Sequence, residues 1–179
     1  MKIEGYIPNR STYAQVIEVM TRYARKDSTS DKIVDLANRI SSLVHPSDNK
    51  SKMIATLNWI KTNLSYTYDH LEAMRLFGMD PEDIELVKSP LAVLESGRYD
   101  CDCIATFIAS IFLYLGVQVR FVIVGFDDSA PETEYEGYSH VYAQGFDESS
   151  GTWVVVDPVS HPDEKCMILD TKRVRVYPL

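Results

Sequence analysis

The stretch DCDCIATFIASIFLYLGVQVRFVIVG, residues 100–125, decides the fold. Residues 102–115 are apolar almost all round, which predicts a helix buried on every side. Gly116 is expected to end that helix. The segment 117–125 that follows is rich in β-branched residues and predicts a strand. The sequence therefore predicts one central buried helix that leads directly into a sheet.

On the C-terminal side of this stretch, the sequence alternates as strands do. The expected strands are YSHVYAQGF (138–146), TWVVVDPV (152–159) and KRVRVYP (172–178). The segment DESSG (147–151) is expected to be the hairpin turn between the first two. Sequential strands joined by short turns should pair antiparallel, so we expect an antiparallel sheet.

The N-terminal half shows helical spacing instead. Ser11 is expected to cap a first helix, and Ser28 with Asp31 has the pattern of a capping box for a second. A third helix is expected within 47–69, and an irregular connection over 80–97 is expected to contain a short helix that stops at Gly97. Helices first and strands afterwards indicate an α+β fold.

Length and composition are those of one globular domain. The chain has 179 residues, of which 45% are hydrophobic and 25% charged, so we expect a single domain over 1–179. A formal net charge of −8 argues against a nucleic-acid partner, which requires a basic surface. The local basic cluster of Lys172, Arg173 and Arg175 is interpreted as the solvated face of the last strand.

The sequence gives no sign of a membrane segment or of export. Residues 103–119 are uncharged, but they are interrupted by polar residues and are shorter than the roughly 20 apolar residues of a span. The start MKIEGYIPNR lacks the apolar core of a secretory signal. We therefore expect a cytoplasmic protein with free thiols.

Three residues form a candidate nucleophile, base and orienting group. Cys101 precedes the buried helix, where unpaired N–H groups and the helix dipole favour a thiolate and a developing oxyanion. His140 lies in one expected strand and Asp157 in the next, so adjacent antiparallel strands bring them within side-chain reach. A carboxylate on the far nitrogen of a histidine fixes its tautomer and stabilises its charged form.

On these motifs the sequence resembles the transglutaminase-like branch of the papain-like cysteine enzymes, in its compact bacterial and phage form. The family has GDC at a helix start, LG at the helix end, HVY or HAW in a strand and W…DP in the next. This chain has YDC at 99–101, LG at 115–116, HVY at 140–142 and WVVVDP at 153–158. The resemblance runs from about residue 30 to about residue 160, and the motifs occur in the family's order.

The resemblance implies a papain-like fold in which Cys101 is the nucleophile, His140 the general base and Asp157 the orienting group. Two features depart from the family pattern. Tyr99 stands where the family has glycine, which would narrow or cover the site, and no side-chain oxyanion donor is identified.

Other interpretations compete for the remaining cysteines and acidic residues. Cys103 and Cys166 are interpreted as structural thiols. A zinc site of Cys101, Cys103, Cys166 and His161 is disfavoured, because Cys-x-Cys on a helix splays the two sulfurs. An acidic loop, interpreted as solvated and not as a cation site, contains Asp127, Asp128, Glu132, Glu134 and Glu136. The aromatic residues expected to form core or groove walls are Trp59, Tyr66, Tyr68, Tyr138 and Tyr142.

Two functions from different classes follow. The first is cysteine-dependent acyl transfer on amide or ester bonds, as a peptidase or amidase with water and as a transglutaminase with an amine. This chemistry requires no cofactor or metal, and its partner is a protein or peptide substrate. The second is a catalytically silent scaffold or binding protein with the same fold, for example a phage virion or assembly component.

Overall fold

The computed structural model describes residues 6–8, 12–42, 44–68, 71, 74, 84–126, 133, 137–159 and 171–179. The helices are, in chain order, α1 (Tyr13–Asp27), α2 (Asp31–Ser41), α3 (Asn49–Asn63), α5 (Pro90–Ser96) and α6 (Cys101–Tyr114). The strands are β1 (Tyr6–Pro8), β2 (Ser65–Tyr66), β3 (Ile84–Leu86), β4 (Arg98–Tyr99), β5 (Val119–Gly125), β6 (His140–Asp147), β7 (Thr152–Val156) and β8 (Arg173–Pro178).

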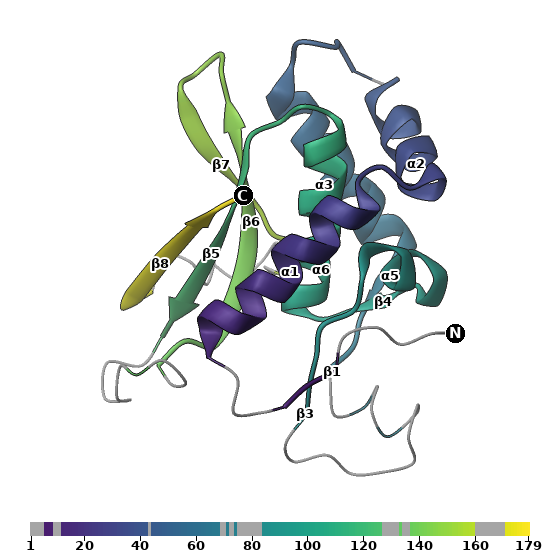
Figure 1. Cartoon of the computed structure of the whole chain (residues 1–179). Coiled ribbons are helices and arrows are strands. Elements are labelled where there is room, and N and C mark those ends of the chain that lie inside the picture. Colours follow the sequence, from purple (N-terminus) through teal and green to yellow (C-terminus); the bar gives the residue numbers. More distant parts are fainter. Residues whose placement is uncertain are drawn as a thin grey trace.

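The central helix predicted from the sequence is α6. Residues 102–112 of α6 are all buried, and α6 contacts α1, α2 and α5 as well as β5 and β6. Figure 1 shows the other helices gathered around it, with the larger sheet on its remaining side. Gly116 follows α6 with a φ of 69°, a left-handed conformation that suits glycine and ends the helix. The prediction of a helix buried on every side is confirmed for residues 102–112, whereas Leu113 and Tyr114 at its end are partly exposed.

The larger sheet has the strand order β7-β6-β5-β8, and all its neighbours pair antiparallel. The predicted hairpin joins β6 to β7, with Gly151 at a φ of 68°. The sequence did not indicate that β8 pairs with β5, on the far side of the sheet from β7. The fold is therefore α+β with helices packed on an antiparallel sheet, as predicted.

Two short sheets lie outside the larger one. β1 pairs antiparallel with β3, and β2 pairs parallel with β4. Strands of two or three residues carry no recognisable alternation, so the sequence analysis did not predict them. The pairing of β2 with β4 matters for the site, because α6 begins just after β4.

Two predictions about local structure are wrong. Ser28 does not cap α2; its hydroxyl donates to the carbonyl of Arg25 at 2.8 Å and belongs to the end of α1. The turn between the two helices is so short that Ser30 is the N-cap of α2. At α1 the cap is Thr12, which forms a capping box with Gln15, while Ser11 lies outside the described residues.

The last strand also differs from its interpretation. Arg173 and Arg175 are half-buried, and the guanidinium of Arg175 lies 4.9 Å from the ring centroid of Tyr138. Val174 and Val176, which alternate with the two arginines, are 54% and 44% exposed. The alternation of β8 thus turns the arginines, and not the valines, toward the helices, and Lys172 alone of the basic cluster is exposed.

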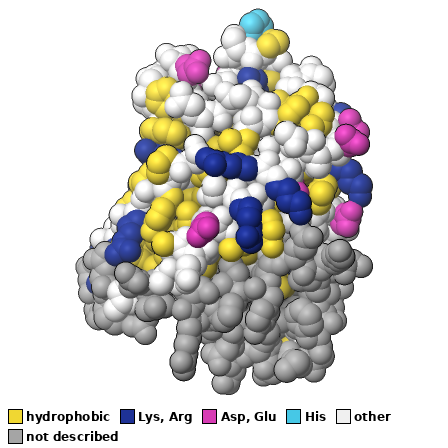
Figure 2. Space-filling model, viewed as in Figure 1, with side chains coloured by type: hydrophobic (Ala, Val, Ile, Leu, Met, Phe, Trp, Pro, Cys, Tyr) yellow, Lys and Arg dark blue, Asp and Glu magenta, His cyan; other side chains and the backbone are white. Residues whose placement is uncertain are grey.

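The view of Figure 2 shows how charge is arranged on the face that carries α1. Lys and Arg side chains gather near the middle of this face, separated by hydrophobic ones. Arg22, Arg25 and Lys26 on α1 are exposed. Arg25 and Lys26 lie in the last turn of α1, where positive charge complements the helix dipole.

None of the described helices has the length and apolar character that crossing a membrane would require.

The absence of a side chain at Gly125, at the end of β5, lets the backbone of Gly137 lie against it just before β6 begins. A Cβ at this position would overlap the backbone carbonyl oxygen of Gly137. Gly145 in β6 is also tight, since a Cβ there would lie 2.8 Å from Cε of Met53 and 3.1 Å from Phe112. The tip of a methionine side chain can move aside, whereas a backbone carbonyl cannot do so cheaply.

We therefore expect Gly125→Ala to lower the free energy of unfolding by about 3 kcal/mol, and Gly145→Ala by only about 1 kcal/mol. Urea unfolding followed by circular dichroism measures both. A Gly125→Ala protein as stable as the wild type would contradict the close approach of the two backbones.

Candidate active site

Cys101 is the first residue of α6, as the sequence predicted, and its side chain is partly exposed. The chain reaches this point through α5, which ends at Gly97 with a φ of 68°, and then through β4. Asp100 is the N-cap of α6, and its carboxylate accepts a hydrogen bond from the N–H of Cys103 at 3.2 Å. The thiol of Cys101 therefore lies in the positive field of a helix N-terminus.

Cys103 has the opposite environment. Its side chain is fully buried; its thiol donates to the carbonyl of Leu86 at 3.2 Å and accepts from the N–H of Lys88 at 3.1 Å. Burial, and then the charges of Asp100 and Asp102, raise the pKa of the Cys103 thiol well above its usual range. Cys103 is thus a protonated thiol that ties the segment after β3 to α6, which confirms its structural interpretation.

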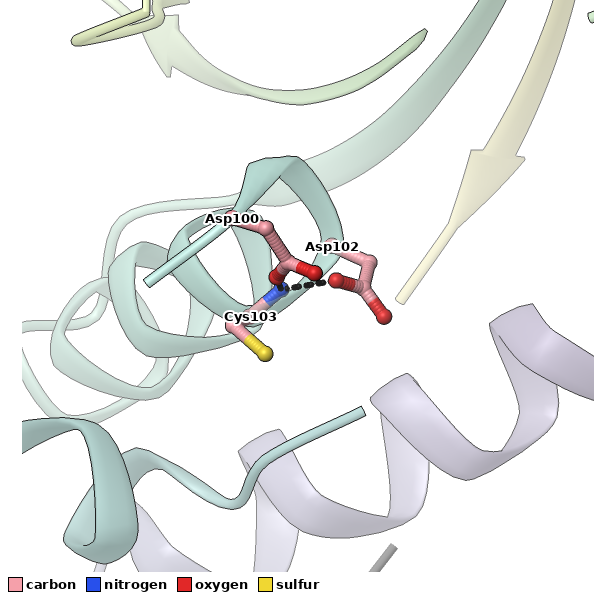
Figure 3. Close-up of side chains that lie close together, drawn as sticks. All are labelled: Asp100, Asp102 and Cys103. Carbon is pink, nitrogen blue, oxygen red and sulfur yellow. Dashed lines mark hydrogen bonds between the residues drawn. The ribbon is translucent and has the colours of Figure 1, made fainter. Parts of the chain in front are cut away.

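Asp100, Asp102 and Cys103 form the group of possible metal ligands that the described part of the chain contains, with their ligand atoms within 4.8 Å of one another. Figure 3 shows that both carboxylates converge on the backbone N–H of Cys103, which is 2.7 Å from the nearer oxygen of Asp102. The carboxylates thus accept a backbone N–H at the start of α6, which stabilises the beginning of the helix. A metal would need the Cys103 thiolate, which the raised pKa of this thiol opposes.

The zinc and cation sites that the sequence analysis disfavoured involve further residues. His161 and Cys166 of the zinc hypothesis are outside the described residues, as are the acidic positions 127, 128, 132, 134 and 136. Tyr66 and Tyr68, expected in the core or a groove wall, are exposed, whereas Tyr142 is buried.

His140 and Asp157 are in direct contact. His140 begins β6, Asp157 follows the end of β7, and Ala143 pairs with Val156 in the ladder between them. His140 Nε2 lies 2.8 Å from Asp157 Oδ2, and the two side chains are 12% and 4% exposed. The contact predicted from the hairpin is present, in an environment that excludes most water and strengthens the interaction.

The carboxylate of Asp157 is held by a second bond. Its other oxygen, Oδ1, accepts from the N–H of Val159 at 3.0 Å, across the turn that contains Pro158. The same carboxylate therefore caps this turn and contacts His140. The hydrogen bond across the turn fixes the direction from which the carboxylate meets the imidazole.

The face of β6 on which His140 lies is defined by its neighbours. Val141 and Ala143 belong to the main core, whereas Tyr142 belongs to a smaller cluster with Val122 and Val124. His140 pairs with Val124 and stacks on Tyr142 with ring centroids 6.1 Å apart. Because His140 is the first residue of β6, its imidazole stands at the end of the sheet.

The start of α6 lies at this same end of the sheet. Gly145 and Phe112 are in contact, as the 3.1 Å from a Gly145 Cβ to Phe112 shows. Going back from Phe112 to Cys101 covers about 17 Å of helix, and going back from Gly145 to His140 covers about 17 Å of strand. Because α6 and β6 run side by side, Cys101 and His140 lie at about the same distance along them from the Phe112–Gly145 contact.

Tyr99 is related to both parts of the candidate site, the start of α6 and the His140–Asp157 pair. It is 4% exposed and lies two residues before Cys101. Burial raises the pKa of its phenol, and the charge of Asp157 raises that pKa further, so the carboxylate lies close enough to act on the ring. The residue that stands where the family has glycine thus precedes Cys101 by two residues and is within electrostatic reach of Asp157.

The model of the Transglutaminase-like superfamily matches residues 34–158. The match covers more than half of the chain, so this chain belongs to the transglutaminase-like superfamily. A comparison with curated proteins found no match.

Solved structures support the same fold. A proposed cysteine protease from Cytophaga hutchinsonii superposes with a TM-score of 0.54 at 15% identity, over 98% of this chain and 55% of its own. A proposed protease from Parabacteroides distasonis superposes with a TM-score of 0.51 at 14% identity, over 82% of this chain and 31% of its own. The chain thus spans about half the length of the first protein and about a third of the second.

The raised pKa of Cys103 predicts a pH dependence of stability. Above about pH 8.5 the unfolded chain ionises this thiol while the folded protein keeps it protonated, so ionisation favours unfolding. Relative to Cys103→Ser, the wild type should lose stability as the pH rises from 8.5 to 10, at up to about 1.4 kcal/mol per pH unit. Urea unfolding of both proteins at each pH measures the difference. A difference independent of pH would contradict a raised thiol pKa.

Proposed function

We propose that this protein is a cysteine-dependent acyl-transfer enzyme that acts on amide or ester bonds with Cys101, His140 and Asp157. The observation that carries the proposal is the buried 2.8 Å contact between His140 and Asp157 at the end of the sheet where α6 begins. The position of Cys101 at the helix N-terminus supports it, and so does the closeness of Tyr99 to Asp157.

In the proposed reaction, the imidazole takes the thiol proton and the sulfur attacks the substrate carbonyl. His140 meets Asp157 through Nε2, so Nδ1 is the nitrogen that would exchange the proton with Cys101. The N–H groups at the start of α6 would stabilise the oxyanion. The imidazolium then protonates the leaving amine or alcohol, and a thioester to Cys101 remains.

A second substrate completes the cycle. Water or an amine gives a proton to His140 and attacks the thioester, which releases an acid or a new amide and restores the thiol. Asp157 orients the imidazole and stabilises the imidazolium. With water the enzyme is a peptidase or amidase, with an amine a transglutaminase, and in both cases the expected partner is a protein or peptide.

A silent scaffold is the second candidate, and the burial of Tyr99 favours it. This large, buried side chain occupies the position where the family has glycine, two residues before Cys101. If it closes the approach to Cys101, the fold would serve for binding or assembly. The two candidates differ in the reactivity of Cys101.

Iodoacetamide labelling of each cysteine between pH 5 and 9, followed by peptide mass spectrometry, tests the proposal. Cys101 should react rapidly near pH 6, because a thiolate paired with an imidazolium persists below the usual thiol pKa. His140→Ala should slow this reaction at least about tenfold at pH 6. Cys103 should remain unlabelled in the folded protein.

His45→Ala is the matched control, because His45 is an exposed histidine outside the site. It should label like the wild type. Reaction of Cys101 that rises only above pH 8, or that His140→Ala leaves unchanged, would sink the enzyme proposal and favour the scaffold.

Asp157→Asn tests the orienting role separately. The amide can still accept from the N–H of Val159, but it cannot stabilise an imidazolium as a carboxylate does. We expect labelling of Cys101 at pH 6 to slow about 10- to 100-fold, with half-maximal labelling shifted to higher pH. The urea midpoint of the same protein measures any loss of stability. An unchanged pH profile would exclude Asp157 as the orienting residue.

A further inference from the structure

Three tyrosines form a row from the candidate nucleophile to the surface. The tyrosine row consists of Tyr99, Tyr66 and Tyr68, which are 4%, 39% and 58% exposed in that order. The ring centroids of Tyr99 and Tyr66 are 5.8 Å apart, and those of Tyr66 and Tyr68 are 5.1 Å apart. Both pairs are edge to face, at 87° and 88°.

Backbone pairing fixes the inner part of the row. In the parallel β2–β4 pair, Tyr66 lies opposite Tyr99. The N–H of Ser65 donates to the carbonyl of Gly97 at 2.9 Å, and that of Thr67 to the carbonyl of Tyr99 at 2.8 Å. Since Cys101 follows β4 by two residues, the row begins at the proposed reaction centre.

The outer end of the row continues as exposed apolar surface. Leu71 and Met74 are 50% and 51% exposed, and the N–H of Leu71 donates to the carbonyl of Tyr68 at 3.1 Å. Four of the eight large hydrophobic side chains that are exposed in the described part of the chain thus fall within 66–74. Such a local concentration of exposed apolar groups marks a binding surface more often than single exposed residues do.

We propose that the tyrosine row is a substrate subsite that receives a large apolar or aromatic side chain of a peptide, adjacent to the bond that Cys101 attacks. This inference rests on the proposed function, because it names the substrate class of the same site. Aromatic rings bind a further ring or alkyl chain through the edge-to-face contacts that they already make with one another.

Two observations favour a peptide side chain over other groups. Neighbouring rings stand perpendicular, so they present edges and faces in turn and not the flat platform on which a sugar ring stacks. Asp157 lies close to Tyr99, and Asp100 directly follows it, so an acidic side chain would be repelled at the inner end.

The experiment compares two chloromethyl ketones, those of N-acetylphenylalanine and N-acetylalanine. In each, the Cys101 sulfur displaces chloride from the methylene carbon. Each rate is divided by the iodoacetamide rate of the same protein, which removes differences in thiol reactivity. We expect the wild type to prefer the phenylalanine reagent at least about tenfold.

Tyr68→Ala should reduce this preference about tenfold, and Tyr68→Phe should retain it, because the ring and not the hydroxyl makes the contact. Tyr114→Ala is the matched control, since Tyr114 is 38% exposed at the end of α6 farthest from Cys101. It should behave like the wild type. A wild type without preference, or a Tyr68→Ala protein with full preference, would overturn the inference.

A binding measurement separates this inference from the proposed function. Cys101→Ala protein labelled with ¹⁵N is titrated with millimolar N-acetylphenylalanine N-methylamide, and amide shifts are followed by NMR. Shifts at Tyr66 and Tyr68 that are absent in Cys101→Ala/Tyr68→Ala are expected. Such shifts with an unreactive Cys101 would overturn the catalytic proposal alone and leave an aromatic-binding site. Fast Cys101 labelling without shifts would overturn the subsite alone.

Discussion

The burial of α6 on every side is the constraint on which the rest of the structure depends. Residues 102–112 have no solvent face, so α1, α2, α5 and the sheet must all cover them. A buried helix start leaves N–H groups that need partners, and Asp100 and Asp102 supply them at Cys103. Within α6 only the two ends meet solvent, at Cys101 and at Leu113 and Tyr114, so Cys101 is the one thiol of this helix that a reagent can reach.

The sheet then determines which side chains lie at its end. The contact of Gly145 with Phe112 sets β6 beside α6, and the absence of a side chain allows the approach. The hairpin to β7 brings Asp157 to the beginning of β6, and the turn at Pro158 holds the carboxylate on His140. The packing of β6 on α6 in the middle of the molecule thus determines the geometry of the His140–Asp157 pair at the end of the sheet.

The sequence predicted those features that local pattern controls. An uninterrupted apolar run gave α6, β-branched alternation gave β5 to β8, and a tight hairpin gave the contact of His140 with Asp157. The sequence did not predict the features that depend on which strands pair in the folded protein. The place of β8 beside β5, which turns Arg175 inward and Val176 outward, and the β2–β4 pair, which brings Tyr66 to Tyr99, leave no pattern in so few residues.

The two cysteines at the start of α6 show how little the residue type alone decides. Successive helical residues are rotated by about 100°, so Cys101 and Cys103 point to nearly opposite sides. One side is the partly open end of the core, in the field of the helix dipole. The other is the packed interior, where Leu86 and Lys88 engage the thiol and burial keeps it protonated. The same helix start therefore holds one thiol at a partly open helix N-terminus and the other, two residues later, in a buried site that raises its pKa.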